Sequence, residues 1–75
     1  MSREIDARGL LCPEPVLLTR RELAKMASGI LRVRVNSAAA KENVTRLAES
    51  MGWEVETASE GDEFVLTLRR PEKKS

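Results

Sequence analysis

The order in which helical and strand-like patterns follow one another most constrains the fold of this chain. Apolar residues recur at helical spacing in two segments, one after Pro15 and one after Ser37. In the segments around them apolar and polar residues alternate, as in half-buried strands. The sequence therefore predicts the element order βαβαββ. Because two helices can cover only one face of four strands, we expect an α/β (α+β) two-layer sandwich with a mixed four-stranded sheet and an open face.

The two helices are bounded by residues with known preferences for helix ends. Pro13 and Pro15 fit the first turn of a helix, where the backbone N–H has no intrahelical acceptor. Ser28-Gly29 ends this first helix, and Asn36 or Ser37 can cap the second. The positions expected to face the sheet are Val16, Thr19, Leu23, Met26 and Ala27 in the first helix and Ala40, Val44, Leu47, Ala48 and Met51 in the second.

The strand-like segments cover residues 3–7, 30–35, 53–57 and 64–69, and a tight turn at 60–62 joins the last two. Alternation assigns one side of each segment to the core and the other to water. The positions expected to face the core are Ile5, Leu31, Val33, Val35, Trp53, Val55, Thr57, Phe64, Leu66 and Leu68.

Charged residues on the open face are interpreted as a solvated surface rather than a binding patch. Arg32 and Arg34 are expected to form cross-strand pairs with Glu54 and Glu56 there. The net charge is +1, the pI is near 7.9, and the chain has one Trp, one Phe and no Tyr. These values give no support to nucleic-acid binding, so we expect no direct nucleic-acid partner.

One cysteine and no histidine narrow the chemistry open to the chain. A single cysteine forms no internal disulfide, and the sequence shows no export signal or membrane span, so we expect a cytoplasmic protein with no membrane partner. No metal-ligand cluster or phosphate-binding loop is visible, and no cofactor is expected. The length predicts one domain over residues 1–75, with a core from 3 to 70 and a frayed tail from 71 to 75. Without a large apolar patch, we expect a monomer.

Cys12 lies beside the predicted start of the first helix. The N–H groups of the first turn and the positive end of the helix dipole can stabilise a thiolate, or the terminal sulfur of a persulfide. Pro13 and Pro15 stiffen the backbone and hold the sulfur outward. A lone cysteine is more often a buried small hydrophobe, and position alone leaves the buried and the reactive interpretations equally open.

The neighbours of Cys12 also have two interpretations each. Glu14 either stabilises the helix start or orients the site and contacts a partner. Asp6 either hydrogen-bonds near the site or caps the loop. Four leucines lie near Cys12 in the sequence, more than the core-facing side of the first helix needs. Some of them are therefore expected at the surface, as an apolar rim that a partner could contact. The alternative is that the loop folds Leu10 or Leu11 into the core. The four leucines are Leu10, Leu11, Leu17 and Leu18.

The pattern Asp6-x-x-Gly9-x-x-Cys12-Pro13-x-Pro15 resembles the signature of the TusA/SirA/YedF family of small sulfur-transfer proteins, and the resemblance extends over residues 5–68. It implies a cysteine that receives sulfane sulfur as a persulfide, here Cys12. The donor would be a cysteine desulfurase or a rhodanese-like protein, and the acceptor another protein. The pathways it implies include tRNA thiolation, molybdenum-cofactor supply, sulfur oxidation and, by likeness to YedF-like members, selenium metabolism.

The resemblance also assigns roles to the motif residues. Asp6 and Glu14 become partner contacts, and Gly9, Pro13 and Pro15 match the rest of the motif. The chain lacks an arginine at the start of the second helix, where Lys41 is the nearest basic residue. This departure leaves donor and acceptor open.

Three functions remain. The chain is expected to be a sulfur carrier, sulfurtransferase-like rather than a stand-alone enzyme, that relays persulfide sulfur from Cys12. The first alternative is a regulatory or RNA-binding module that uses the open sheet face. The second is a thiol redox sensor, which the absence of a resolving cysteine weakens.

Overall fold

A computed structural model describes residues 2–9 and 14–71, and these form the predicted order βαβαββ. The expected fold class is therefore confirmed. The elements are β1 (Ser2–Asp6), α1 (Glu14–Lys25), β2 (Gly29–Val35), α2 (Ala38–Ser50), β3 (Glu54–Glu60) and β4 (Glu63–Arg70).

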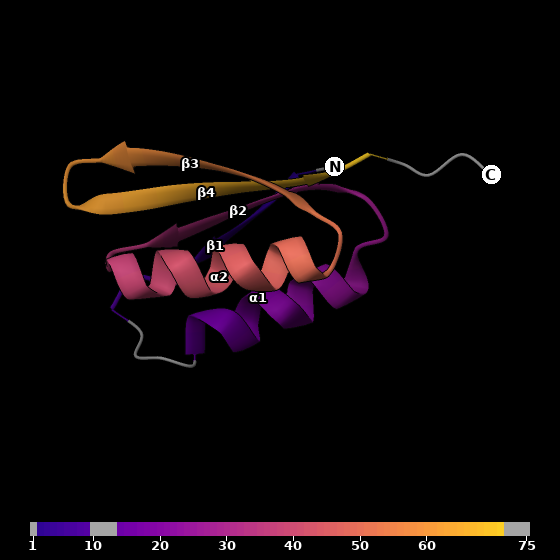
Figure 1. The fold of residues 1–75 in the computed structure, drawn as a ribbon, viewed down its shortest axis with the longest axis horizontal. Coiled ribbons are helices and arrows are strands. Elements are labelled where there is room, and N and C mark those ends of the chain that lie inside the picture. Colours follow the sequence, from indigo (N-terminus) through magenta and orange to yellow (C-terminus); the bar gives the residue numbers. More distant parts are fainter. Residues whose placement is uncertain (1, 10–13, 72–75) are drawn as a thin grey trace.

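The four strands form one mixed sheet in the order β1-β2-β4-β3. β1 and β2 are parallel and are connected through α1, whereas β4 pairs antiparallel with both β2 and β3. Both helices lie on one face of this sheet, and the other face carries no helix (Figure 1). The open face predicted from the number of helices is thus present.

The predicted pairing of Arg32 and Arg34 with Glu54 and Glu56 is wrong. Those residues lie on β2 and β3, which are separated by β4. The alternation of side chains assigns a residue to a face of the sheet, but it does not say which strands are neighbours. Arg34 instead contacts Glu4, Glu60 and Glu63, while Glu54 pairs with Arg69 at 3.5 Å.

The core lies between the sheet and the helices, as the alternation predicted. The side chains with the least exposure include Leu31, Val33 and Val35 from β2, and Leu66 and Leu68 from β4, all with 0% exposure. The helices add Thr19, Leu23, Val44 and Ala48, and Trp53 packs just before β3.

Two predicted core positions are exposed in the structure. Ala27 lies beyond α1, which ends at Lys25 where Met26 N–H donates to the Leu23 carbonyl oxygen at 3.1 Å in a tighter turn. Thr57 lies on β3, an edge strand of the sheet, and its side chain is exposed there.

The ends of α2 follow the sequence signals closely. Ser37 is the N-cap, and its side chain accepts a hydrogen bond from Ala40 N–H at 3.1 Å. At the other end, Gly52 has a φ of +86°, and Trp53 N–H donates to the Ala48 carbonyl oxygen at 2.9 Å in a Schellman arrangement.

Both helices begin toward the end of the molecule where the β3–β4 turn lies (Figure 1). Their positive dipole ends therefore face the same side of the structure. Within the described ranges, neither helix has the length and apolar character needed to cross a membrane.

Candidate functional site

The predicted site lies between the end of β1 and the start of α1. Glu14 is the first residue of α1, and only Pro13 separates it from Cys12 in the sequence. The structure describes Asp6, Gly9, Glu14 and Pro15, whereas the predictions for Cys12, Pro13, Leu10 and Leu11 lie outside the described residues.

The start of α1 agrees with the two sequence signals that predicted it. Pro15 is buried in the first turn, where its missing N–H leaves no bond unmade. Glu14 is exposed in the same turn, and its charge is favourable beside the positive end of the helix dipole. This position agrees with the interpretation that Glu14 stabilises the helix start, and it leaves the carboxylate accessible to solvent.

The backbone that leaves β1 is held by three successive N–H groups. Ala7 N–H donates to the Arg34 carbonyl oxygen at 2.8 Å, which prolongs the pairing of β1 with β2. Arg8 N–H then donates to Asp6 Oδ1 at 3.1 Å, and Gly9 N–H donates to Asn36 Oδ1 at 3.2 Å. The segment is therefore fixed as far as Gly9, whose φ of +77° is in the region that favours glycine.

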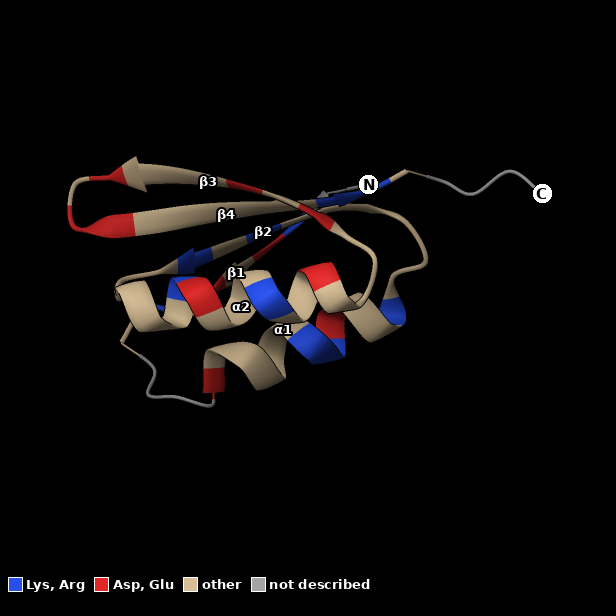
Figure 2. Cartoon of the chain, in the orientation of Figure 1, with Lys and Arg blue, Asp and Glu red and all other residues tan. Residues whose placement is uncertain are grey.

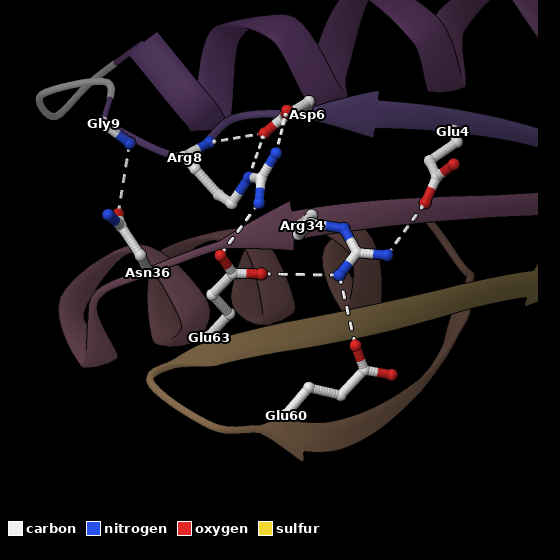
Figure 3. Close-up of polar contacts among 8 residues, drawn as sticks. All are labelled: Glu4, Asp6, Arg8, Gly9, Arg34, Asn36, Glu60 and Glu63. Atoms are coloured by element: carbon white, nitrogen blue, oxygen red, sulfur yellow. Dashed lines mark hydrogen bonds and ion pairs between the residues drawn. The ribbon is translucent and has the colours of Figure 1, made fainter.

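Both carboxylate oxygens of Asp6 accept hydrogen bonds from Arg8. Arg8 Nε donates to Asp6 Oδ1 at 2.8 Å and Nη2 donates to Oδ2 at 2.7 Å (Figure 3). These side-chain hydrogen bonds, together with the bond from Arg8 N–H, lower the pKa of Asp6 from 3.8 to about 2. The geometry corresponds to the loop-capping interpretation of Asp6.

Arg8 also reaches the end of the β3–β4 hairpin. Its Nη1 donates to Glu63 Oε2 at 2.8 Å, and the other oxygen of Glu63 accepts from Arg34 Nη1 at 3.4 Å (Figure 3). Arg34 further contacts Glu60 at 3.2 Å and Glu4 at 3.4 Å. We call the six residues of this ion-pair network the charge network: Glu4, Asp6, Arg8, Arg34, Glu60 and Glu63.

The charge network shifts the pKa values of four of its members in the directions that favour their charged forms. The hydrogen bond from Arg8 lowers the pKa of Glu63, and bonds to Asp6 and Glu63 raise the pKa of Arg8. Bonds to Glu60 and Glu63 raise the pKa of Arg34. The four carboxylates of the network exceed its two cations, and acidic residues mark the β3–β4 turn in Figure 2.

Sequence reasoning did not identify Arg8, Asn36 and Glu63 as parts of this region. Arg8 and Glu63 are 55 positions apart, and Gly9 and Asn36 are 27 positions apart. Hairpin and crossover geometry bring them together, and no local periodicity carries that information. Asn36 was the one residue whose type could have suggested such a contact, because the Asn side chain, like that of Ser, can accept a hydrogen bond from a free backbone N–H.

The apolar rim is described only in its α1 portion. Leu17 is 43% exposed, the large hydrophobic residue that stands out on the described surface, and Leu18 is half-buried. Leu17 lies one turn after Glu14, on the same exposed side of α1. Among the described residues, no three His, Cys, Asp or Glu side chains gather in a way that could hold a metal ion.

Comparison with known proteins identifies related chains over nearly the whole length. The family model described as Sulfurtransferase TusA matches residues 3–70. A candidate sulfur carrier protein of Bacillus subtilis, YrkI, is 37% identical over 68 residues, which cover 88% of this chain and 91% of YrkI. The sulfur carrier protein TusA of Pseudomonas syringae is 33% identical over 70 residues, 89% of this chain and 82% of that protein.

A solved structure has the same fold. The crystal structure of a SirA-like protein from Desulfitobacterium hafniense matches with a TM-score of 0.86 and 29% sequence identity. The match covers 93% of this chain and 99% of that one. Sequence and structure comparisons therefore agree on the same group of relatives.

Proposed function

Since this chain belongs to the TusA/SirA-like family of sulfur carrier proteins, we propose that it accepts sulfane sulfur as a persulfide on Cys12 and relays it to an acceptor protein. The observation that carries the proposal is the position of the motif cysteine in the chain. Cys12 is two residues before the first residue of α1, in the segment that leaves β1. The N-terminus of a helix favours an anionic sulfur, whether thiolate or persulfide.

The relay consists of two exchange steps at sulfur. The Cys12 thiolate attacks the terminal sulfur of a donor persulfide, the donor S–S bond breaks, and the donor cysteine leaves as a thiolate. An acceptor thiolate then attacks the terminal sulfur of the Cys12 persulfide, and Cys12 leaves as a thiolate. Each step forms one bond to sulfur and breaks another, so the relay needs no external oxidant or reductant.

The charges in the described part of the motif are compatible with an anionic cysteine. The chain has no histidine, and a preformed thiolate would need no general base from this chain. A free carboxylate near Cys12 would oppose thiolate formation. Arg8 balances the charge of Asp6 through two side-chain hydrogen bonds. The carboxylate of Asp6 therefore opposes thiolate formation less than a free carboxylate would.

The partners proposed for the relay follow from its chemistry. The donor is a protein that carries a cysteine persulfide, a cysteine desulfurase or a rhodanese-like protein, and the acceptor is a protein thiol. Exposed Leu17 and Glu14, one helical turn apart, support a docking surface at the start of α1. The acceptor would decide whether the sulfur serves tRNA thiolation, selenium metabolism or another pathway.

Mass spectrometry of the intact protein tests the relay. We expect the chain to gain one sulfur mass when it is mixed with a cysteine desulfurase and cysteine in buffer without reductant. The gain should disappear in Cys12→Ser, and reduction should remove it from the wild type. No gain, or a gain that persists in Cys12→Ser, would contradict the proposal, and salt-dependent RNA binding that survives Cys12→Ser would favour the RNA-binding alternative instead.

A further inference from the structure

β3 is an edge strand of the sheet with free backbone groups along one side. It pairs with β4, and the order β1-β2-β4-β3 leaves its other side without a described neighbour. The strand is seven residues long, contains no Pro or Gly, and has all but one of its residues exposed. Backbone N–H and C=O groups on alternate residues therefore point away from the sheet, where an extended segment of another chain can pair with them.

A groove with a volume of about 260 Å³ lies between this edge and α2. β3 contributes Thr57 to the groove, and α2 contributes Lys41, Glu42, Thr45 and Arg46. A strand added to β3 would point alternate side chains into this groove. Because the groove holds two cations and one carboxylate, uncharged side chains fit there better than basic ones.

The opposite edge of the sheet differs from the β3 edge. There, Arg3 of β1 pairs with Glu22 of α1 at 2.8 Å, so an ion pair spans the gap between strand and helix. The ion pairs of β3 instead run within the sheet, to Arg69 on β4 and Arg34 on β2. The described residues thus include no ion pair that bridges β3 to α2.

The other side of β3 carries carboxylates. Val55 pairs with the buried Leu68, so the residues that alternate with it point to the open face of the sheet. Three of these are glutamates: Glu54, Glu56 and Glu60. Glu54 and Glu60 each pair with an arginine, whereas Glu56 takes part in no ion pair with another described residue. Outward side chains of an added strand would meet this acidic edge, which basic residues complement.

The glutamates of β3 disfavour a second copy of this chain as the added strand. Antiparallel pairing of β3 with its own copy would bring the glutamates of both copies to one face, where like charges opposite each other are destabilising. We propose that the β3 edge binds an extended basic segment of a partner protein as a further strand, with Lys or Arg beside the glutamates and uncharged residues toward α2. The inference goes beyond the proposed relay and does not depend on it, because backbone pairing at β3 involves no sulfur chemistry.

The synthetic peptide Lys-Thr-Lys-Val-Lys-Thr-Lys, titrated into the intact chain, tests the pairing by NMR. We expect saturable binding that shifts the amide resonances of β3 more than those of β1 and that weakens at high salt. N-methyl groups on one alternate set of peptide residues should abolish binding, and on the other set should leave it, because only alternate N–H groups of a strand face its neighbour. The same peptide with Glu in place of Lys should not bind.

Glu56→Gln and Glu4→Gln form the matched pair of variants. Both residues lie in one row across the open face, in which Arg32 and Thr67 stand between them. They are three strand spacings apart, roughly 14 Å. Because an exposed charge is largely screened beyond about 10 Å at 0.1 M salt, we expect Glu56→Gln to raise the peptide Kd by about twofold to fivefold and Glu4→Gln to leave it nearly unchanged.

The proposal is overturned if binding of the basic peptide does not saturate, if both N-methylated peptides bind alike, or if the two variants have equal effects. It is also overturned if the chain dimerises through β3 and the peptide does not displace the second copy, because the occupant of the edge is then that copy. The peptide contains no cysteine, so these outcomes are separate from the gain of sulfur mass that tests the relay.

Discussion

The guanidinium of Arg8 joins Asp6, two positions before it in the chain, to Glu63 at the start of β4. Its two ion pairs measure 2.7 Å to Asp6 and 2.8 Å to Glu63. One side chain thereby connects the motif to the end of the β3–β4 hairpin, which pairs with β2 but not with β1. Asp6 and Arg8, at the start of the motif, are therefore held by the tertiary fold as well as by their own turn.

We expect Arg8→Ala to lower the free energy of unfolding more at low salt than at high salt. The contacts of Arg8 are exposed, so mobile ions screen them and their contribution is modest. Urea unfolding at two sodium chloride concentrations measures the difference. Arg8→Lys is the matched control, because it keeps the charge but loses the planar fork that serves both carboxylates. Equal losses at both salt concentrations would contradict an ion-pair role.

Asp6 should make the stability of the protein depend on acid pH. Its pKa in the folded state is about 2, below the ordinary value of 3.8, because Arg8 donates to its carboxylate. Protons therefore bind the unfolded state first as the pH falls. The stabilisation is fully present above pH 3.8 and is lost as the pH falls through about 2.

Unfolding measured between pH 5 and pH 2 in the wild type and in Asp6→Asn tests this dependence. The lowered pKa of Glu63 adds to the wild-type slope in the same direction. We expect Asp6→Asn to be less stable than the wild type at pH 5 and to lose less stability as the pH falls. Parallel pH curves for the two proteins would show that Asp6 has an ordinary pKa in the folded state.

Replacement of Gly9 should destabilise the fold through the backbone alone. A Cβ built at Gly9 meets no atom within 4 Å, but the φ of +77° is strained for a residue with a side chain. We expect Gly9→Ala to cost about 1–2 kcal/mol, which corresponds to a fall in Tm of roughly 4–8 °C per kcal/mol in a domain of this size. Gly9→Asn should cost less, because Asn tolerates this conformation, and equal costs would rule out a conformational origin.

The fold could be predicted because its signals are local. Leu31, Val33 and Val35 alternate with two arginines, and the structure buries all three as that alternation requires. Strand neighbours are set by pairing between distant segments, so the local alternation carries no information about the position of β4 beside β2. The erroneous pairing of Arg32 and Arg34 with β3 arose from this missing information.

The site divides in the same way. Pro13 and Pro15 predicted the helix start, and α1 begins at Glu14 with Pro15 in its first turn. The acceptor of Gly9 N–H and the second carboxylate on Arg8 come from residues 27 and 55 positions away. A motif specifies its own turn, whereas the groups that hold it in place depend on the whole topology.

Leu17 should contribute to docking and little to stability. Its side chain is 43% exposed on α1, whereas Leu23 on the same helix is 2% exposed. If the start of α1 receives the sulfur donor, Leu17→Ala should raise the donor concentration needed for half-maximal sulfur loading and leave Tm nearly unchanged. Leu23→Ala should do the reverse, with a loss of about 2–5 kcal/mol in stability and ordinary donor dependence in the folded fraction. Unchanged loading by Leu17→Ala would contradict a docking role for this side chain.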